Sequence, residues 1–420
     1  METLTISKSN IKGDVYIPDS KSFLHRMLIA GGFFAKDNIT IKLLSEHICD
    51  DILATINFLE GVGVKIERNK NELKIQPIKN LKILKDKEVE IHVNESGTTL
   101  RFILPIIAMT GMKAQIVCEQ SLIDRPIGPL VEALNMAGAS IEINKNIIYC
   151  GGKISAKVLE IDPSLSSQYV SGLIFAICID SKKKIKITNK LVSKQYIEMT
   201  CNIMKDFGYE IIFEDNIVFA KKVKVPNKSV FVSTGDWSSA APFFVAAAIA
   251  GEIRVHGLDF IYPQADAQIL KILQDAGAFV KITDEYIEVK KEKLNAVEVD
   301  IEDYPDLGPI LVVLMSLSEG KNILKSIDRI KFKESDRKES IISLLINLSV
   351  HVEVRSDKLV IYGKDVIDTP LTYQGQDHRM AMAYSIMALV NKSQIKILKP
   401  ECVKKSYNDY WNDYFKLRVE

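Results

Sequence analysis

Stretches with helical periodicity alternate along the chain with stretches in which every second position is apolar, and one combination of the two recurs. It reads INFLEGVGVKIE, VEALNMAGASIEI, CNIMKDFGYEII and LKILQDAGAFVKI, with Gly63, Gly138, Gly208 and Gly277 spaced by 75, 70 and 69 residues. A fifth copy, LLINLSVHVEV, has Ser349 at the equivalent place, 72 residues further on. Glycine is favoured in the left-handed conformation that ends many helices, and the following alternation is typical of a half-buried strand. Each copy therefore predicts a helix, a left-handed residue and a strand.

A second pattern repeats at the same interval, in which a short polar segment precedes a long helix that is apolar on nearly every side. The segments begin 76, 70, 72, 68 and 71 residues apart, at Ser20, Ser96, Ser166, Ser238, Asp306 and Asp377. Helices without a polar face are buried, and Ser, Thr and Asp are preferred N-caps. The pattern therefore predicts six buried helices that open at these polar residues.

Six such units account for the 420 residues, and each is long enough for two helices and several strands. Chain length by itself predicts two or three domains. Structural duplication explains the glycine positions, whereas the polar segments carry additional cations and hydroxyl groups. The free N–H groups of a helix N-terminus favour anions. Several such segments facing one cavity would therefore bind a polyanionic ligand.

Composition narrows the class of protein. Apolar residues make up 47% of the chain and charged residues 26%, which is the balance of a soluble globular protein. The formal net charge is +1, so the basic excess of a general nucleic-acid binder is missing and no nucleic-acid partner is predicted. Any anion site must arise from local clustering of the 55 Lys and Arg residues.

The six cysteines form no CxxC pair, and their spacing fits no zinc site. Several lie in apolar runs, as Cys178 does in LIFAICI, so we expect small buried side chains and a reducing, cytoplasmic environment. The first ten residues, METLTISKSN, lack the apolar core of a signal peptide. Apolar runs such as APFFVAAAIAG are too short to cross a bilayer, so no membrane contact is predicted.

Three motifs in the first third of the chain place cations beside helix starts. DSKSFLHR holds Lys21, Ser22 and Arg26 around one start, where a cation in the first turn opposes the helix dipole unless an anion is bound. ESGTTLRF places Gly97 where backbone N–H groups can approach a ligand closely. In IDRPIG the proline after Arg125 biases that residue towards an extended backbone and restricts its conformation. The guanidinium group of arginine is suited to binding carboxylate or phosphate. Ordinary caps and surface cations explain each motif taken alone.

Two motifs in the middle of the chain offer neutral hydrogen-bonding groups. SLSSQYVSGL presents Ser166, Ser167 and Gln168 at a helix start, and SKQY presents Ser193 and Tyr196. Hydroxyl and amide groups can donate to phosphate oxygens and exchange hydrogen bonds with hydroxyls. Capping accounts for one serine of the first motif but not for its glutamine as well.

The last third of the chain adds charged groups. Asp306, in EDYPDLGPI, precedes an apolar helix, where a plain N-cap is the usual role. The run IKFKESDRK has mixed charges, which usually form an exposed face. If this run is helical, Lys333 and Arg337 share a face and repel, and an anion between them would remove that cost. QDHRMAMAYS contributes Arg379, and PECVKKSYNDYW contributes Lys405.

Together these motifs place one cluster of cations and hydroxyl groups in each repeat unit. The chain has no GxGxxG or GxxxxGKS motif for nucleotides. It also has no HExxH or other close pair of metal ligands and no GxSxG nucleophile motif. We therefore predict no metal site.

In order and spacing, ten motifs resemble those of the 5-enolpyruvylshikimate-3-phosphate (EPSP) synthase family, from about residue 5 to the C-terminus. They are DSKSFLHR, ESGTTLRF, DRPIG, SSQY, SKQY, GDWSSAAPFFVAAA, YPDLGP, KESDR, DHRMAMAYS and CVKKSYNDY. The resemblance implies an α+β fold, the two-domain α/β prism of enolpyruvyltransferases, with three copies of a βαβαββ unit in each of two hinged domains. It also implies a discontinuous domain I, residues 1–18 and 235–420, and a domain II of residues 19–234.

The resemblance implies a reaction as well. The enolpyruvyl group of phosphoenolpyruvate moves to the 5-hydroxyl of shikimate 3-phosphate and phosphate is released, in the shikimate pathway of aromatic amino acid biosynthesis. The reaction proceeds by addition and elimination through a tetrahedral intermediate, without a metal or organic cofactor. The family pattern suggests a monomer, and contacts from both halves of the chain imply domain closure on binding shikimate 3-phosphate.

Matched motif by motif, the resemblance implies that Asp306 accepts the 5-hydroxyl proton and that Lys21 and Glu334 exchange the methylene proton. The matched shikimate 3-phosphate contacts are Lys21, Ser22, Arg26, Ser166, Ser167, Gln168, Ser193, Tyr196, Asp306 and Lys333. The matched phosphoenolpyruvate contacts are Lys21, Gly97, Arg125, Gln168, Arg337, Arg379 and Lys405.

The sequence departs from the family pattern at two places. Arg329 stands where the family often has asparagine, so no role is transferred to it. Glu95-Ser96-Gly97-Thr98 stands where Asn-Ala-Gly-Thr is usual, and the conserved glycine favours sensitivity to the herbicide glyphosate.

Three alternatives remain open at this stage. The sister enzyme that acts on UDP-N-acetylglucosamine usually carries a cysteine in the loop where this chain has DRPIG, and Cys118 lies seven residues before Arg125 in an apparent strand. A third relation of the fold processes RNA 3′-phosphate ends and needs a nucleotide and its own histidine, for which no motif is present. A non-catalytic polyanion-binding or scaffold protein is disfavoured by the intact Lys21, Asp306 and Glu334.

Overall fold

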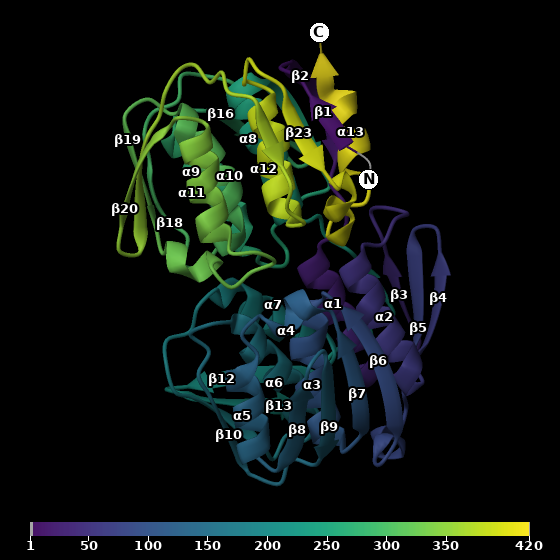
Figure 1. The fold of residues 1–420 in the computed structure, drawn as a ribbon. Helices are drawn as coiled ribbons and strands as arrows, with labels where there is room; N and C mark the ends of the chain where they lie inside the picture. The colour runs from purple at the N-terminus through teal and green to yellow at the C-terminus, as the bar shows by residue number, and fades with distance from the viewer. Residues whose placement is uncertain (1–2, 420) are drawn as a thin grey trace. The chain divides into compact units, whose positions relative to one another are not determined.

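Two compact units make up the computed structural model, which describes residues 3–419 (Figure 1). Unit 2 comprises Asp19–Thr234 and Ile261–Gln264, and unit 1 comprises Met1–Pro18, Gly235–Phe260 and Ala265–Glu420. Residues 1, 2 and 420, which the predicted domain I includes, lie outside the described residues.

The segment Ile261–Gln264 belongs to unit 2 although the chain on both sides of it belongs to unit 1. The Tyr262 hydroxyl donates to Asp206 Oδ2 at 2.8 Å, and Gln264 Oε1 accepts from Ser20 Oγ at 3.1 Å. These contacts hold the segment against unit 2. They join residues far apart in the sequence, so no local pattern predicts them.

Unit 2 contains three four-stranded sheets built on one plan. In spatial order, the first strand of each sheet pairs parallel with the second. The second then pairs antiparallel with the third, and the third antiparallel with the fourth. In spatial order the sheets are β14 (Val230–Val232), β3 (Ile39–Lys42), β5 (Glu72–Gln76), β4 (Lys65–Asn69); β6 (Glu88–Asn94), β7 (Lys113–Cys118), β9 (Ile147–Gly152), β8 (Ala139–Asn144); and β10 (Val158–Ile161), β11 (Lys184–Ile187), β13 (Ile217–Lys222), β12 (Tyr209–Glu214).

The helices of unit 2 fall into two classes. Three are buried along almost their whole length and form the centre of its hydrophobic core, namely α1 (Lys21–Phe34), α3 (Gly97–Thr110) and α6 (Ser167–Ile179). The others have an exposed side: α2 (Asp50–Val62), α4 (Gln120–Ile123), α5 (Gly128–Met136), α7 (Lys194–Asp206) and the 3₁₀ turn η1 (Leu81–Leu84). The buried helices are the apolar helices that the sequence predicts.

The described residues of unit 1 also form three sheets. One of these has four strands, in the order β18 (Glu298–Asp300), β19 (Lys321–Lys325), β21 (Lys358–Tyr362), β20 (His351–Arg355). A five-stranded sheet has the order β16 (Phe279–Ile282), β17 (Tyr286–Lys290), β15 (Gly251–His256), β2 (Asn10–Tyr16), β24 (Arg418–Val419). The last has the order β1 (Thr3–Ile6), β23 (Ile395–Leu398), β22 (Leu371–Tyr373).

The sixth repeat therefore exchanges strands with its neighbour. In the other repeats the last strand pairs antiparallel with the second strand, as β13 does with β11. In the sixth repeat β1 takes that place beside β23, and the last strand of the chain, β24, pairs with β2 in the five-stranded sheet. In Figure 1 the purple strands β1 and β2 lie among the yellow elements of the opposite end of the chain. Six sheets built from repeated βαβαββ units are present, three in each unit, and the two that contain the chain's ends depart from the four-stranded plan.

The helices of unit 1 repeat the division into two classes. The buried ones are α8 (Trp237–Ala250), α10 (Gly308–Leu317) and α12 (His378–Ala388), which form the centre of a second hydrophobic core. The remaining helices and 3₁₀ turns are α9 (Ile269–Asp275), α11 (Arg337–Asn347), α13 (Tyr410–Leu417), η2 (Ala265–Gln268), η3 (Pro305–Leu307), η4 (Ile327–Ile330) and η5 (Pro400–Lys405). No helix within residues 3–419 is long and apolar enough to cross a membrane.

The predicted left-handed residues are confirmed. Gly63, Gly138, Gly208 and Gly277 have φ angles of 110°, 108°, 85° and 92°, and Ser349 has a φ of 55°. Each follows a helix of its repeat and precedes the antiparallel pair of strands. The repeated glycine is therefore set by backbone conformation, which a side chain rarely tolerates.

Four of the six predicted helix caps are confirmed, since the side chains of Ser20, Ser96, Ser166 and Asp377 accept backbone N–H groups. The start predicted at Ser238 is wrong, because α8 is capped two residues earlier by Asp236, which accepts from Ser239 N at 2.7 Å. The N-cap role of Asp306 is also wrong, because it lies within η3, and neither η3 nor α10 has a side-chain cap.

Candidate active site

The first turns of α1, α3 and α6 carry many of the predicted site residues of unit 2, and a close crossing of α3 and α6 holds one of them, Gln168, in place. A Cβ atom on Gly172 of α6 would lie 2.3 Å from the carbonyl O of Arg101 in α3, so the two helices can approach this closely only at a glycine. Gln168 Nε2 donates to Thr98 Oγ1 at 2.9 Å, and its Oε1 accepts from Arg101 Nη1 at 2.7 Å. The predicted contact Gln168 is thereby held against the start of α3.

Gly97 opens α3 beside two guanidinium groups. A Cβ atom at this position would lie 3.0 Å from Arg101 Nη1 and 3.5 Å from Arg125 Nη1. Arg125 is buried, with 8% of its surface exposed. Two cations therefore join the positive end of the helix dipole, which is an arrangement that favours a bound anion. The structure brings the predicted residues Gly97 and Arg125 together.

Arg26 is buried inside unit 2 and is held by polar groups of three helices. Its Nε donates to Thr200 Oγ1 at 2.8 Å and its Nη1 to the carbonyl O of Ser22 at 2.8 Å. Its Nη2 donates to Ser171 Oγ at 3.4 Å. The guanidinium carbon lies 5.8 Å from the ring centroid of Tyr196. Burial lowers the pKa of Arg26 to about 10, which leaves the side chain charged at neutral pH. Ser22, Arg26 and Tyr196 thus form one cluster.

The predicted serines lie at two helix starts. Ser166 Oγ accepts from Gln168 N at 3.2 Å as the cap of α6, and Ser167 is buried in the first turn. Ser193 precedes α7 with a φ of 48° and is buried. A left-handed residue other than glycine costs on the order of 1–3 kcal/mol and persists where its surroundings hold it. Ser193 is therefore fixed in place by the fold of unit 2.

Lys21 lies in the first turn of α1, and a carboxylate offsets its unfavourable position there. Its Nζ is 2.8 Å from Asp51 Oδ2 at the start of α2. The negative charge compensates the repulsion between a cation and the positive end of the helix dipole. Sequence reasoning missed Asp51, because its partner lies 30 positions away and no local pattern marks the pair.

In unit 1, Arg337 is completely buried and its guanidinium contacts three carboxylates. Its Nε donates to Asp377 Oδ2 at 2.7 Å, its Nη1 to Asp306 Oδ1 at 2.6 Å and its Nη2 to Glu334 Oε2 at 2.7 Å. The part of IKFKESDRK that precedes Arg337 is not α-helical, since α11 begins only at this residue, where Asp336 caps it. Lys333 and Arg337 consequently do not share a helix face, and their charges meet at a common carboxylate instead.

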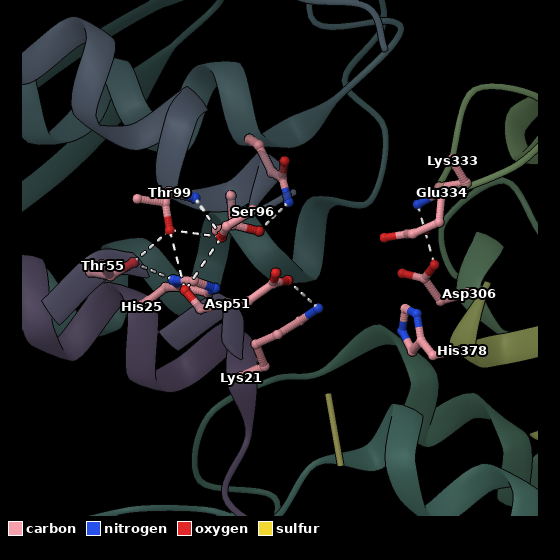
Figure 2. A network of polar contacts seen from close by, with 12 residues as sticks. Lys21, His25, Asp51, Thr55, Ser96, Thr99, Asp306, Lys333, Glu334 and His378 are labelled. Atoms are coloured by element: carbon pink, nitrogen blue, oxygen red, sulfur yellow. Dashed lines mark hydrogen bonds and ion pairs between the residues drawn. The ribbon is translucent and has the colours of Figure 1, made fainter. Parts of the chain in front are cut away.

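That common carboxylate belongs to Asp306, which Figure 2 shows beside Lys333 and Glu334. Its Oδ1 lies 2.6 Å from Arg337 Nη1 and 3.4 Å from Lys333 Nζ. Burial alone would raise the pKa of the Asp306 carboxyl. The cations of Lys333, Arg337 and Arg379 outweigh burial and hold this pKa well below its usual range. Asp306 is therefore ionised at neutral pH.

Arg379 and Asp266 meet at the start of α8. Arg379 Nη1 donates to the carbonyl O of Ser238 at 2.6 Å, and the Ser238 hydroxyl donates to Asp266 Oδ2. Burial, together with the negative charge of Asp306, raises the pKa of Asp266 to about 7. Sequence reasoning missed Asp266, which lies in η2 within the unremarkable segment YPQADAQ.

Two further positions complete the placement of the sequence-derived residues. Lys405 is the last residue of η5 and is buried. Arg329, which stands where the family often has asparagine, lies in η4 and its Nε donates to the carbonyl O of Glu302 at 3.4 Å. Within the described part of the chain, no group of three or more His, Cys, Asp or Glu residues could hold a metal ion.

Replacing Asp266 by asparagine is expected to remove a loss of stability that the wild-type chain shows as pH rises from about 4 to about 7. The pKa of Asp266 is about 7 in the folded chain against an ordinary value of 3.8, so the folded state keeps a proton that the unfolded state releases. This stabilising contribution is complete below the ordinary value and is lost as pH rises through the folded-state value. One proton changes the free energy of unfolding by at most about 1.4 kcal/mol per pH unit.

The measurement is urea unfolding of unit 1 at several pH values, followed by the fluorescence of Trp237 and Trp411, which are the two tryptophans of the chain and belong to this unit. Asp275→Asn, at an exposed carboxylate of α9 that pairs with Lys271, serves as the control. Equal pH dependence in Asp266→Asn, in the control and in the wild type would contradict the prediction.

Comparison with known proteins adds an independent finding. The family model described as EPSP synthase (3-phosphoshikimate 1-carboxyvinyltransferase) matches residues 6–414. A protein from Brachyspira hyodysenteriae named 3-phosphoshikimate 1-carboxyvinyltransferase is 33% identical over 96% of both chains. Another of that name from Clostridium kluyveri is 33% identical over 100% of this chain and 98% of its own length.

Solved structures share the fold. An EPSP synthase from Acinetobacter baumannii superposes with a TM-score of 0.79 and 21% identity, and the match covers 100% of this chain and 99% of that one. The enolpyruvyl transferase NikO from Streptomyces tendae gives a TM-score of 0.71 at 14% identity, over 99% of this chain and 97% of that one. The predicted enolpyruvyltransferase-like α+β fold is confirmed.

Proposed function

The chain belongs to the EPSP synthase family of transferases, and we propose that it transfers the enolpyruvyl group of phosphoenolpyruvate to the 5-hydroxyl of shikimate 3-phosphate. The products are 5-enolpyruvylshikimate 3-phosphate and phosphate. The observation that most directly supports this reaction is the ionised Asp306 carboxylate held between Lys333 and Arg337. A carboxylate among cations suits a reaction that removes a hydroxyl proton beside anionic groups.

Asp306 takes the role of the base on the 5-hydroxyl, and Lys21 and Glu334 take the roles of groups that exchange the methylene proton. Glu334 accepts from Arg337 Nη2, and Lys21 is paired with Asp51, so both side chains have a defined orientation. Oriented acids and bases lower the barrier because no reorganisation is needed when the proton moves.

The base strength of Asp306 depends on its surroundings. A carboxylate whose pKa is held far below its usual range is a weak base in the free protein. A substrate phosphate beside Lys333 would share the positive charge that now stabilises the carboxylate, and the pKa of Asp306 would rise. Substrate binding would thereby strengthen the base that the reaction needs.

The binding roles follow the family match. For shikimate 3-phosphate we propose the unit 2 cluster of Ser22, Arg26, Ser166, Ser167, Gln168, Ser193 and Tyr196, with Lys333 from unit 1. For phosphoenolpyruvate we propose Lys21, Gly97, Arg125, Gln168, Arg337, Arg379 and Lys405. The two guanidinium groups beside Gly97 support an anion at the start of α3.

The thiol chemistry of the sister enzyme has no counterpart at Cys118. This residue ends β7 and is buried, and burial raises the pKa of its thiol to about 12. A thiol that remains protonated is a poor nucleophile or acid–base group at neutral pH. The geometry therefore favours shikimate 3-phosphate over UDP-N-acetylglucosamine as the acceptor.

The proposal is tested by mixing the purified chain with phosphoenolpyruvate and shikimate 3-phosphate and measuring the release of phosphate. We expect release with this pair and none when UDP-N-acetylglucosamine replaces shikimate 3-phosphate. Phosphate release only with UDP-N-acetylglucosamine would contradict the proposal. No phosphate release with either acceptor would favour a non-catalytic anion-binding protein.

Three finer points belong to the same proposal. We propose that the enzyme works in the cytoplasm as a monomer, in keeping with the family pattern. Glyphosate is expected to inhibit it, because the glycine of the family motif is kept at Gly97, beside Arg101 and Arg125.

A further inference from the structure

A chain of buried hydroxyl groups runs from His25 through Thr55 and Thr99 to Ser96 in unit 2, as Figure 2 shows. His25 Nδ1 lies 2.7 Å from Thr55 Oγ1, which lies 2.7 Å from Thr99 Oγ1. Thr99 Oγ1 in turn lies 2.7 Å from Ser96 Oγ. The side chains of these residues are shielded from solvent, so each hydrogen bond must be made within the protein.

The protons of this chain have a preferred order. Burial lowers the pKa of His25 to about 3, so the imidazole is neutral at physiological pH and carries one N–H. Its Nε2 has no hydrogen-bond partner among residues 3–419. A buried N–H without a partner is rarer than an unpaired acceptor, so the proton belongs on Nδ1 and is donated to Thr55. Thr55 then donates to Thr99, and one hydroxyl of the Thr99–Ser96 pair donates to the carbonyl O of Asp51.

The ordered chain ends on the backbone of the residue that holds Lys21. The carbonyl O of Asp51 lies 3.4 Å from both Ser96 Oγ and Thr99 Oγ1, and the Asp51 carboxylate accepts from Lys21 Nζ at 2.8 Å. Ser96 also accepts from Thr99 N as the cap of α3, immediately before Gly97. The hydroxyl groups therefore connect α1, α2 and α3 at the two places where we propose that phosphoenolpyruvate binds.

We propose that Thr55 and Thr99, with their proton order set by His25, are positioning residues that align Lys21 and Gly97 for phosphoenolpyruvate. The inference rests on the proposed function, because that function assigns both aligned residues to this substrate. Neither threonine is among the proposed substrate contacts. Their effect passes through the Asp51 carbonyl and the cap at Ser96.

A separate hydroxyl pair in the same unit provides a comparison. Thr200 Oγ1 accepts from Arg26 Nε at 2.8 Å and lies 2.9 Å from Ser171 Oγ. This pair supports the guanidinium that we assign to shikimate 3-phosphate. Buried threonines of one unit thus support the proposed contacts of two different substrates, Thr55 and Thr99 those of phosphoenolpyruvate and Thr200 that of shikimate 3-phosphate.

The test is steady-state kinetics of Thr55→Val and Thr99→Val, which remove a hydroxyl group and keep the volume of the side chain. We expect the KM for phosphoenolpyruvate to rise about tenfold, a ratio that corresponds to about 1.4 kcal/mol. The KM for shikimate 3-phosphate is expected to stay within about twofold. Thr55→Ser restores the hydroxyl group and is expected to return the KM for phosphoenolpyruvate to about twofold of the wild-type value.

Two control variants separate positioning from stability. Thr110→Val removes a buried hydroxyl group at the far end of α3, where it donates to the carbonyl O of Ile106 at 2.8 Å, and it is expected to leave both KM values unchanged. Thr200→Val is expected to raise the KM for shikimate 3-phosphate and to leave that for phosphoenolpyruvate unchanged. Equal increases of both KM values in Thr55→Val, or a lower melting temperature with both KM values unchanged, would overturn the inference.

The order of the protons has its own readout, which does not depend on activity. Nitrogen-15 NMR of the imidazole is expected to show the His25 proton on Nδ1 and no titration between about pH 5 and pH 8. A proton on Nε2 would contradict the ordered chain. Absence of phosphate release by the wild-type protein would instead contradict the proposed function, so the two failures are distinguishable.

Discussion

Replacing Asp306 by alanine is expected to lower kcat by a factor of about 10² to 10⁴, the range that a general base contributes. The affinity for shikimate 3-phosphate is expected to change by less than about tenfold. The variant loses the carboxylate but keeps Lys333 and Arg337, whose positive charge then has less compensation and attracts an anionic substrate at least as well. Phosphate-release kinetics give kcat, and calorimetry gives the dissociation constant.

Asp328→Ala is the matched control for this experiment. Asp328 is an exposed carboxylate of the same unit whose Oδ1 lies 2.6 Å from Lys338 Nζ. An exposed ion pair contributes little to stability, and this one includes none of the proposed site residues. We expect kcat within about twofold of the wild-type value. A similar kcat in Asp306→Ala would remove Asp306 from the mechanism.

Replacing Arg337 by methionine is expected to lower the free energy of unfolding of unit 1 by about 3–5 kcal/mol and to abolish turnover. The change removes one partner of a buried charge network and leaves the carboxylates of Asp306, Glu334 and Asp377 facing one another. Arg337→Lys keeps the charge but supplies one nitrogen in place of the planar fork, so an intermediate loss is expected.

Urea unfolding followed by the fluorescence of Trp237 and Trp411 measures the stability of unit 1. Arg355→Met, which breaks the exposed pair with Glu353, is expected to change this stability by less than about 1 kcal/mol. Adding Asp377→Asn to Arg337→Met removes one uncompensated charge and is expected to recover part of the loss. If Arg337→Met unfolds at the same urea concentration as the wild type, the buried guanidinium is not needed to compensate the charges of the three carboxylates, and the prediction is wrong.

The repeating part of the fold could be predicted from the sequence because its causes are local. The φ angle of Gly138 depends on the two residues around it, and the cap at Ser96 needs only the first turn of α3. The apolar helices were recognisable for a similar reason, since a helix without a polar face must be buried. These signals recur every seventy residues or so, and each copy strengthens the prediction of the others.

The parts that could not be predicted depend on partners far away in the chain. Asp306 looks like a helix cap in its own segment, and only the folded unit shows that Arg337, 31 positions later, takes its carboxylate. The pairing of Lys21 with Asp51 and the raised pKa of Asp266 have the same origin. The family resemblance supplied the roles of site residues, but it did not supply the groups that orient them.

The strand exchange in unit 1 has a consequence for synthesis on the ribosome. The segments of β1 and β2 emerge first, whereas their partners β23 and β24 end at Leu398 and Val419. At about 5–20 residues per second β1 waits on the order of 20–80 s for β23, whereas β2 can pair with β15 as soon as Gly251–His256 has emerged. Unit 2 is nearly continuous, so it can fold during that interval. Polar residues at alternate positions of β2, NIKGDVY, lessen the tendency of the waiting strand to aggregate.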